Sequence, residues 1–384
     1  MTPAGKRRFE KGTDMNRWLK TMGVAAAAAA MGLSMASCSK KPAGNEAAAA
    51  AAAAPADKEY TIGWTIYAGW MPWPYAEQAG IVKKWADKYH VKIKLVQIND
   101  YVESLNQYTA GKLDGVTSTN MDGLTIPAAG GRDSTVVMVG DYSNGNDGVV
   151  LKNGKSMADI KGRSVNIVAN SVSQYLLARC LESAKMKNTD VKLVNTSDAD
   201  MVSAFAAPGT NAMVTWNPML LEVKKAPGAT EVCDSSKIPA EIEDMLLLST
   251  DVAKANPDVA KALAGIWYET MSIMSKDDDA GKAARTAMAK LSGTDLPGFE
   301  AQLKTTFLYA DPKAAEAFMT GQQIVDANDK VRKFSFENGL FGQGAKSVDD
   351  IGIEFSGGKI LGNPQNVKLR FDPTYVKAAA AGTL

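Results

Sequence analysis

Residues 60–98, YTIGWTIYAGWMPWPYAEQAGIVKKWADKYHVKIKLVQI, contain the pattern that decides the fold. Short apolar runs at 60–67 and 91–98 flank a segment, 75–89, whose apolar residues recur at helical spacing. The two runs are typical of buried strands, and the segment between them is typical of an amphipathic helix. Strand–helix–strand units of this kind predict helices packed on a largely parallel sheet.

The same alternation continues through two cycles. The first cycle extends to the strand at 134–141, the second begins near residue 147, and mainly helices follow after about residue 250. We therefore predict a two-lobed α/β protein, each lobe a mostly parallel sheet flanked by helices, with a helical C-terminal return onto lobe 1. The predicted lobes are residues 58–146 plus 245–384 (lobe 1) and residues 147–244 (lobe 2). Ligands of such sheets bind beyond the carboxyl ends of the strands, here in the cleft between the lobes.

The composition excludes several classes of protein. The chain has 384 residues, 46% hydrophobic and 22% charged, with a formal net charge of +1. This is enough for two or three core-sized units, and it is unlike a disordered chain or a basic nucleic-acid binder. The single histidine, His90, argues against histidine-based metal sites and Ser-His or Cys-His catalysis. We expect no catalytic residue, metal or cofactor.

The first residues indicate export. A basic segment over 1–20 precedes an uncharged run, TMGVAAAAAAMGLSMAS, which ends before Cys38, so residues 1–37 are predicted to be a signal peptide starting at Met1 or Met15. Met35-Ala36-Ser37-Cys38 resembles a bacterial lipobox, which implies a lipid on Cys38 and a protein held in the periplasm by that anchor alone. Ser39 favours the outer membrane. The alanine-rich remainder of residues 38–57 reads as a flexible tether.

Five short motifs occur in a recognisable order over residues 60–225. They are YAEQAGI at 75–81, AGKLDG at 110–115, DIKGR at 159–163, SVSQY at 171–175 and WNP at 216–218. In this order they resemble the nitrate/sulfonate/taurine group of ABC-importer substrate-binding proteins. The resemblance implies a monomer of the type II-like periplasmic binding fold that works with permease and ATPase subunits and binds no nucleic acid. Residues 321–384 extend beyond most members, and the sequence assigns them no role.

The segment GWTIYAGWMPWPYAEQAG, residues 63–80, also resembles a narrower branch of this group encoded beside urea carboxylases. That resemblance implies guanidinium or urea as the ligand. An anion such as taurine, an alkanesulfonate or nitrate is the alternative.

Several residues at predicted strand ends are candidates for ligand contact. Trp70 and Trp73 follow the first strand and could attract a cation over their rings, or could pack the edge of the lobe. Trp216 ends a strand beside Asn217 and points to the cleft, where it could stack on a planar ligand.

Polar candidates fall at the same ends. Asp122 could accept two guanidinium N–H groups, or could serve as a helix-start acid. Asn120 suits urea or a helix cap, and Asp147 could meet ligand at the crossover or belong to a loop turn. Ser171 and Ser173 begin a helix whose N–H groups favour an anion, and both could equally be caps.

Two other functions compete with capture of a solute. The thiamine-pyrimidine synthases share the lobe architecture, but resemblance to them requires an active-site histidine, and His90 ends a helix away from the strand ends. The second competing function is that of a sensory module whose closed form docks onto a membrane receptor. Cys180 and Cys233 are expected to be two buried thiols, because one lies within a helix and the other follows a strand.

Overall fold

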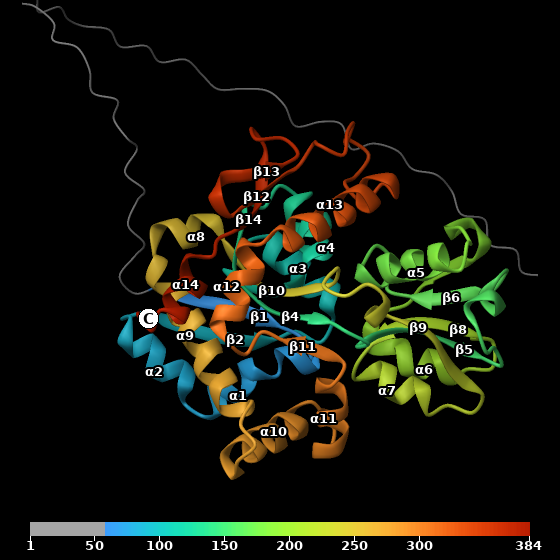
Figure 1. Ribbon diagram of the computed structural model, residues 1–384, viewed down its shortest axis with the longest axis horizontal. Coiled ribbons are helices and arrows are strands. Elements are labelled where there is room, and N and C mark those ends of the chain that lie inside the picture. The colour runs from blue at the N-terminus through green and yellow to red at the C-terminus, as the bar shows by residue number, and fades with distance from the viewer. Residues whose placement is uncertain (1–57) are drawn as a thin grey trace, which may run out of the picture. The chain divides into compact units, whose positions relative to one another are not determined.

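The computed structural model describes residues 58–384. The predicted signal peptide 1–37, the lipidation site Cys38 and the tether to residue 57 lie outside the described residues. Two β-sheets organise the described part, and the second sheet with its helices (green in Figure 1) stands beside the elements of the first. We call the two groups of elements lobe 1 and lobe 2.

The sheet of lobe 1 has nine strands in the order β13-β12-β14-β4-β10-β3-β1-β2, with β11 paired to β4. Its strands are β1 (Glu59–Trp64), β2 (Lys92–Gln97), β3 (Gly115–Thr119), β4 (Ser134–Ser143), β10 (Glu243–Ser249), β11 (Thr306–Leu308), β12 (Gly352–Phe355), β13 (Lys359–Leu361) and β14 (Val367–Phe371). β1 runs parallel to β2 and β3, whereas β10 runs antiparallel to β3 and β4.

The sheet of lobe 2 has five strands in the order β7-β6-β8-β5-β9. They are β5 (Asp147–Lys152), β6 (Ser164–Ile167), β7 (Lys192–Asn195), β8 (Ala212–Trp216) and β9 (Ala229–Asp234). β6 runs parallel to β7 and β8, and β5 runs antiparallel to β8 and β9.

The two-lobed α/β prediction is confirmed, but the prediction of mostly parallel sheets is wrong in part. Both sheets are mixed, because the chain passes between them twice. It leaves lobe 1 through β4, enters lobe 2 through β5 and returns from β9 to β10. The connecting strands therefore run against their neighbours and bring residues near 143–147 and 235–244 to the junction of the lobes.

Helices cover the sheet of lobe 1. They are α1 (Pro72–Gln78), α2 (Ile81–Lys88), α3 (Tyr101–Thr109), α4 (Asn120–Gly123), α8 (Thr250–Ala255) and α9 (Pro257–Met274). The single helix expected over 75–89 is two, because Gly80 adopts φ of 75°, which a helix cannot contain. α9 is buried along most of its length and packs against α1 and α2.

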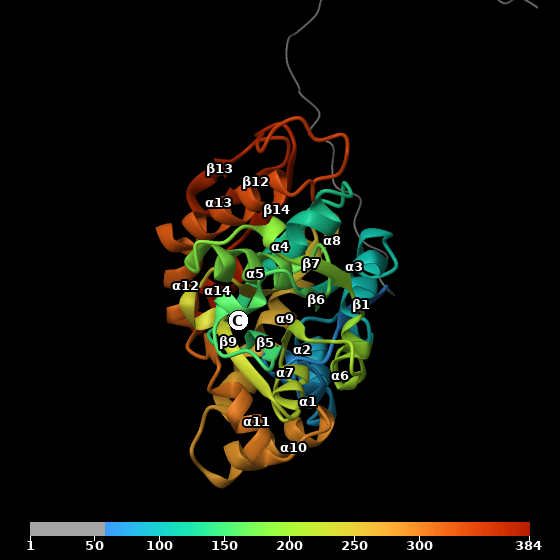
Figure 2. The same ribbon diagram turned by 90° about the vertical axis from the view of Figure 1, so that its right-hand side faces the viewer.

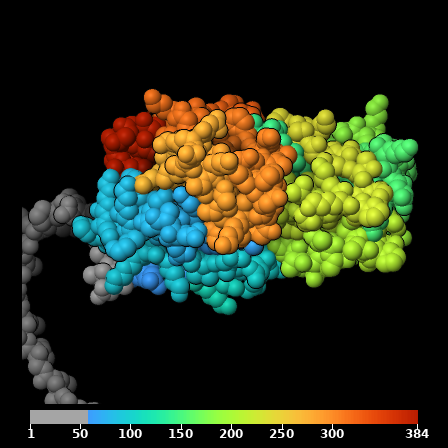
Figure 3. Space-filling view, turned by 90° about the horizontal axis from the view of Figure 1, so that it is seen from below, coloured from blue at the N-terminus to red at the C-terminus, as the bar shows by residue number. Residues whose placement is uncertain are grey.

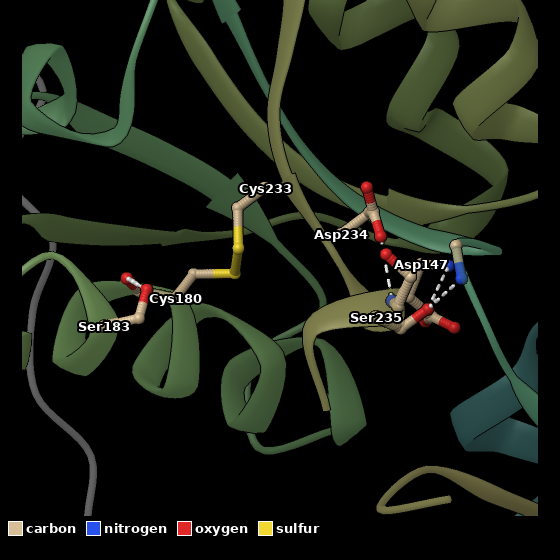
Figure 4. The surroundings of a disulfide bond; sticks show 8 residues. Asp147, Cys180, Ser183, Cys233, Asp234 and Ser235 are labelled. Atoms are coloured by element: carbon tan, nitrogen blue, oxygen red, sulfur yellow. Dashed lines mark hydrogen bonds between the residues drawn. A yellow bond between two sulfur atoms is a disulfide. The ribbon is translucent and has the colours of Figure 1, made fainter. Parts of the chain in front are cut away.

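Lobe 2 carries α5 (Val172–Ser183), α6 (Met201–Ala206) and α7 (Met219–Lys224). Cys180 on α5 and Cys233 on β9 form a disulfide bond (Figure 4). The prediction of two free thiols is therefore wrong. The side chain of Cys180 faces the sheet that α5 covers, and residue spacing along the chain does not reveal which strand that helix covers. A disulfide agrees with the export signal, because exported proteins form such bonds.

The C-terminal part returns to lobe 1, as predicted, but it is not purely helical. Its helices are α10 (Asp279–Leu291), α11 (Leu296–Leu303), α12 (Pro312–Thr320), α13 (Gln322–Glu337) and α14 (Thr374–Ala380). Strands β12–β14 extend the sheet of lobe 1 beyond β4, and they lie with α13 at one end of the molecule, opposite α10 and α11 (Figure 2). Figure 3 shows the α10–α11 segment, in orange, beside the surface of lobe 2.

No helix between residues 58 and 384 is both long and apolar enough to span a membrane.

Candidate functional site

A small cavity lies where the two lobes meet. Its lining residues are Tyr67, Trp70, Tyr101, Thr119, Asp147, Val172, Trp216, Ile242 and Asp244. They come from strand ends and helix starts of both lobes and from the crossover into β10, as expected for the carboxyl edges of such sheets. The cavity has a volume of about 20 Å³, counted as the space that the centre of a water molecule can occupy. By the same measure one water molecule needs about 10–15 Å³. The cavity therefore suits a solute of a few heavy atoms.

Aromatic rings form much of the wall. Trp70 lies 5.7 Å from Tyr101 between ring centroids, and Tyr101 meets Trp216 edge-on at 6.0 Å. The contact of Tyr101 with Trp216 joins the two lobes. Tyr67 stands edge-on to Trp70 at 5.1 Å. Such faces attract a cation by about 0.5–2 kcal/mol each, more as the site becomes drier.

Asp147 begins β5 and supplies one carboxylate of the lining. Its Oδ2 accepts a hydrogen bond from Ser143 Oγ at 2.6 Å, and its backbone N–H points to Ser143 Oγ. The same N–H lies 3.4 Å from Ser235 Oγ (Figure 4). Burial raises the pKa of Asp147 to about 7, and the Ser143 hydrogen bond only partly opposes this. No basic side chain among the described residues compensates its charge.

Asp244, on β10, supplies the second carboxylate. It stands opposite Asp141 of β4 in the antiparallel register, so the two buried side chains lie next to each other on the same face of the sheet. Asp141 lies behind the lining, where its Oδ1 accepts a hydrogen bond from Tyr67 Oη at 2.8 Å. Gly69 permits this packing, since a Cβ at that position would lie 2.4 Å from Asp141 Oδ2. Burial first and the neighbouring acid second raise the pKa of Asp244 well above its usual value.

Asp122 lies just outside the lining and joins the lobes. Its Oδ2 accepts hydrogen bonds from Tyr101 Oη at 3.0 Å, Thr119 Oγ1 at 2.9 Å and the backbone N–H of Val172 at 3.3 Å. Burial raises its pKa to about 6. Its Oδ1 accepts no hydrogen bond from the described residues. Asp122 thus lies in the first turn of a helix, as predicted, and contacts three residues of the cavity lining without being part of that lining.

The start of α5, where an anion could have bound, is already occupied by the protein. The Val172 N–H points to Asp122, and the Ser173 N–H donates to Ser171 Oγ at 3.2 Å. Ser171 is therefore a cap, and neither serine is part of the lining. The carboxylate of Asp122 fills the place that an anionic ligand would need.

The remaining sequence candidates lie away from the cavity lining. Trp73 packs in the core on Trp267, with ring centroids 5.3 Å apart. Asn120 holds the crossover, donating to the Glu241 carbonyl at 3.2 Å and accepting from the Glu243 N–H at 3.3 Å. Asn217 bonds to the lobe junction, its N–H donating to Asn146 Oδ1 at 3.2 Å. Trp70, Asp147 and Trp216 are thus the sequence candidates that the structure brings together at the lining.

Sequence reasoning missed six lining residues, which are Tyr67, Tyr101, Thr119, Val172, Ile242 and Asp244. A signal was available for Asp244, because the acids of EIED at 241–244 immediately precede the buried run MLLLS. Its neighbour Asp141 ends the predicted strand at 134–141, but nothing along the chain indicates that the two acids meet.

A second group of charges lies outside the cavity on the same crossover. Glu241 accepts hydrogen bonds from Tyr175 Oη at 2.6 Å, Arg179 Nε at 3.0 Å and Lys330 Nζ at 2.7 Å. Burial alone would raise the pKa of Glu241, but the hydrogen bonds from Lys330, Tyr175 and Arg179 outweigh it and hold this pKa below its usual value. We call these four residues the rim cluster.

Within residues 58–384 no group of three or more His, Cys, Asp or Glu side chains is arranged to hold a metal ion. His90 is exposed at the end of α2 and is not part of the lining.

The family model described as NMT1/THI5 like matches residues 78–276, just over half of the chain. The chain belongs to the NMT1/THI5-like family. The matched residues include most of the cavity lining of this NMT1/THI5-like protein, from Tyr101 to Asp244.

Solved structures share the fold of this NMT1/THI5-like chain. The alkanesulfonate-binding protein of Xanthomonas axonopodis, bound to MOPS, superimposes with a TM-score of 0.63 at 17% identity over 76% of this chain and 96% of that protein. The periplasmic aliphatic sulphonate binding protein of Escherichia coli gives 0.62 at 19% identity, covering 74% and 94%. The periplasmic nitrate-binding protein of Synechocystis gives 0.55 at 12% identity, covering 85% and 98%. The periplasmic binding protein fold predicted from the sequence is confirmed.

The matches to relatives found by sequence cover less of the chain than the structural matches do. A Brucella abortus protein whose name describes a binding protein is 27% identical over 150 residues, 38% of this chain. The chain matches 46% of the length of that relative.

Proposed function

We propose that this NMT1/THI5-like protein captures a small planar cation of the guanidinium type by closure of its two lobes and delivers it to an ABC importer. The observation that carries the ligand class is the lining itself. Asp147 and Asp244 face the cavity beside Trp70, Tyr67, Tyr101 and Trp216, and no Lys, Arg or His is among the lining residues.

Buried carboxylates without a counter-charge are costly, and a ligand cation removes that cost. A guanidinium ion presents N–H donors around its edge and two flat faces. Carboxylate oxygens suit the edge, and aromatic rings suit the faces. The small size of the cavity favours an unsubstituted ion, and the resemblance of residues 63–80 to the urea-carboxylase-associated branch points the same way.

Delivery to an importer is supported by the fold and the likeness to binding proteins. Ligand would bridge Asp147 and Trp216 of lobe 2 to Asp244 and Trp70 of lobe 1, and so would favour the closed form through contacts that exist only there. The predicted export signal and the lipobox resemblance at 35–38 support a periplasmic protein anchored through Cys38, with permease and ATPase subunits as its partners.

An anion is the second candidate, favoured by the names of the sulfonate- and nitrate-binding neighbours. An anion in this cavity would face Asp147 and Asp244, and the N–H of Val172 is already bonded to Asp122. Urea, which is neutral, would satisfy the oxygens of the acids without balancing their charge.

The test is a thermal-shift and calorimetry panel at pH 7.5 with guanidinium, urea, nitrate, taurine and an alkanesulfonate. Guanidinium is used from micromolar to low millimolar concentrations, far below those at which it denatures proteins. A specific ligand at 100 times its Kd stabilises by about 2.7 kcal/mol, which such an assay resolves. We expect stabilisation by guanidinium above that by urea. Stabilisation by an anion alone would overturn the cation assignment.

A further inference from the structure

The pair formed by Asp141 and Asp244, which we call the acid pair, is unusual in having no counter-charge. The two residues are neighbours across β4 and β10, and both are buried. Asp244 lines the cavity, whereas Asp141 stands behind it and does not. Two carboxyl groups in contact cannot both ionise at moderate cost, so such a pair keeps one proton between them.

The surroundings of the acid pair add negative or neutral groups only. Facing it are Tyr67 from the segment after β1, Asp147 from β5 and Tyr309 after β11, with Asp122 acting on Asp147 and Glu243 on Tyr309. No lysine, arginine or histidine of the described residues acts on either acid. Within residues 58–384, therefore, only a proton is left to balance the second charge of the pair.

We propose that the empty protein holds a proton between Asp141 and Asp244 and that a cation entering the cavity displaces it, so that capture of each ligand releases about one proton. This rests on the cationic ligand proposed above. The O–H bond of the pair breaks, the proton leaves to water or buffer, and the ligand cation takes over its charge-balancing role. Release of the ligand restores the proton.

The consequence is an affinity that rises with pH. Below the pH at which the empty pair loses its proton, the cation must compete with that proton, and affinity falls about tenfold per pH unit for one proton displaced. Guanidinium, like the arginine side chain, stays charged across this range, so the dependence comes from the protein. Burial raises the pKa of Asp141 to about 7 and that of Asp244 well above its usual value, so the empty pair holds at least one proton at pH 6.5.

The test is isothermal titration of guanidinium chloride into the protein at pH 6.5, in several buffers that differ in ionisation enthalpy. The slope of the observed heat against that enthalpy counts the protons released. We expect about one or more in the wild type, since Asp147 also has a raised pKa. In Asp141→Asn, an amide that can donate to Asp244 replaces the neighbouring acid and so lowers the pKa of Asp244, and fewer protons should be released than in the wild type.

The matched control is Asp200→Asn, an exposed acid of lobe 2, which should release as many protons as the wild type. An equal count in Asp141→Asn, or heat without any proton release in the wild type, would overturn this inference and leave the proposed cation binding intact. Absence of guanidinium heat at every pH from 6 to 8.5 would overturn both. If Asp141→Asn does not fold, Asp147→Asn takes its place: it should still release about one proton, and loss of all proton release in that variant would assign the proton to Asp147 and overturn the inference.

Discussion

Glu241 and Asp244 are three residues apart on the same crossover, and their surroundings are opposite. Glu241 points to the rim cluster, where Tyr175, Arg179 and Lys330 donate to its carboxylate. Asp244 points to the cavity, where its nearest charged partner is another acid, Asp141. The pKa of Glu241 is lowered and that of Asp244 is raised.

This difference indicates that the two acids have different roles: Glu241 links elements of the fold, whereas Asp244 belongs to the proposed ligand site. The rim cluster receives its positive charges from the chain itself, from α5 of lobe 2 and from α13 of the C-terminal part, so its acid is balanced without a ligand. The cavity contains acids whose positive partner the chain does not supply. A buried site whose negative charge has no positive partner in the chain is most readily explained as the binding site of a positively charged ligand.

The largest expected effect is on the stability of the empty protein as a function of pH. An unfolded aspartate titrates near pH 3.9, whereas Asp122 and Asp147 in the folded protein titrate at about 6 and about 7. Between these values the folded state binds more protons, so the stability from these groups is full at low pH and is lost as pH rises. We expect a lower Tm at pH 8 than at pH 5, with low-millimolar guanidinium recovering much of the loss. Glu241, whose pKa is lowered, contributes stability that is lost only at pH values below this window.

Next is the substitution Asp147→Asn, which removes a cavity charge but keeps its shape. A hydrogen bond to a charged group is worth about 1.5–3 kcal/mol, so affinity for guanidinium should fall by about 10–100-fold. The Tm of the ligand-free protein at pH 8 should rise, because a buried uncompensated charge is gone. Calorimetry and thermal unfolding measure both. Unaltered affinity would remove Asp147 from the site, and Asp200→Asn is the control.

The matching change in the rim cluster, Glu241→Gln, should act with the opposite sign on stability. It leaves Arg179 and Lys330 without their carboxylate, and because their side chains are 30% and 54% exposed we expect a loss of about 1–2 kcal/mol rather than more. Guanidinium affinity should change far less than in Asp147→Asn. Thermal unfolding at pH 7.5 checks the first expectation, and calorimetry checks the second. A stabilised Glu241→Gln protein would contradict the contrast drawn between the two acids.

The smallest effect concerns the aromatic wall. Trp216→Leu removes one ring face and should weaken guanidinium binding by about 3–30-fold, the equivalent of about 0.5–2 kcal/mol. Trp216→Phe keeps a weaker face and should lose less. Equal losses in the two variants, measured by calorimetry, would show that ring area and not the π face matters.

Much of the fold was predictable because it follows from the local spacing of apolar residues along the chain. The apolar runs that became β1–β8 and the long buried stripe of α9 were identified from spacing alone. Strands β9 and β11–β14 were missed. β9 and β13 are largely unburied, β11 and β12 have only three and four residues, and β14 (VKLRF) alternates apolar and basic residues within a part of the chain that was expected to be helical. The antiparallel course of β5 and β10 was missed because it depends on how the chain crosses between lobes.

The residues of the candidate site were likewise predictable only in part. Trp70, Asp147 and Trp216 could be proposed because strand ends converge in any sheet of this kind, and all three line the cavity. Trp73 and Asn120 stand at equally suggestive positions, yet packing on Trp267 and bonding to the crossover direct them elsewhere. Whether a side chain at a strand end points to a ligand or to a neighbour depends on contacts with distant segments.

The sequence by itself determined the alternation of strands and helices and led to the prediction of an export signal, because each is a property of nearby residues. Only the tertiary structure decided that Tyr67, Asp141 and Asp244 share one buried site, that Cys180 meets Cys233, and that Asp122 fills the start of α5. These pairings join segments that are 50 or more residues apart in the chain. Their energies come from burial and register, which exist only once both sheets have formed.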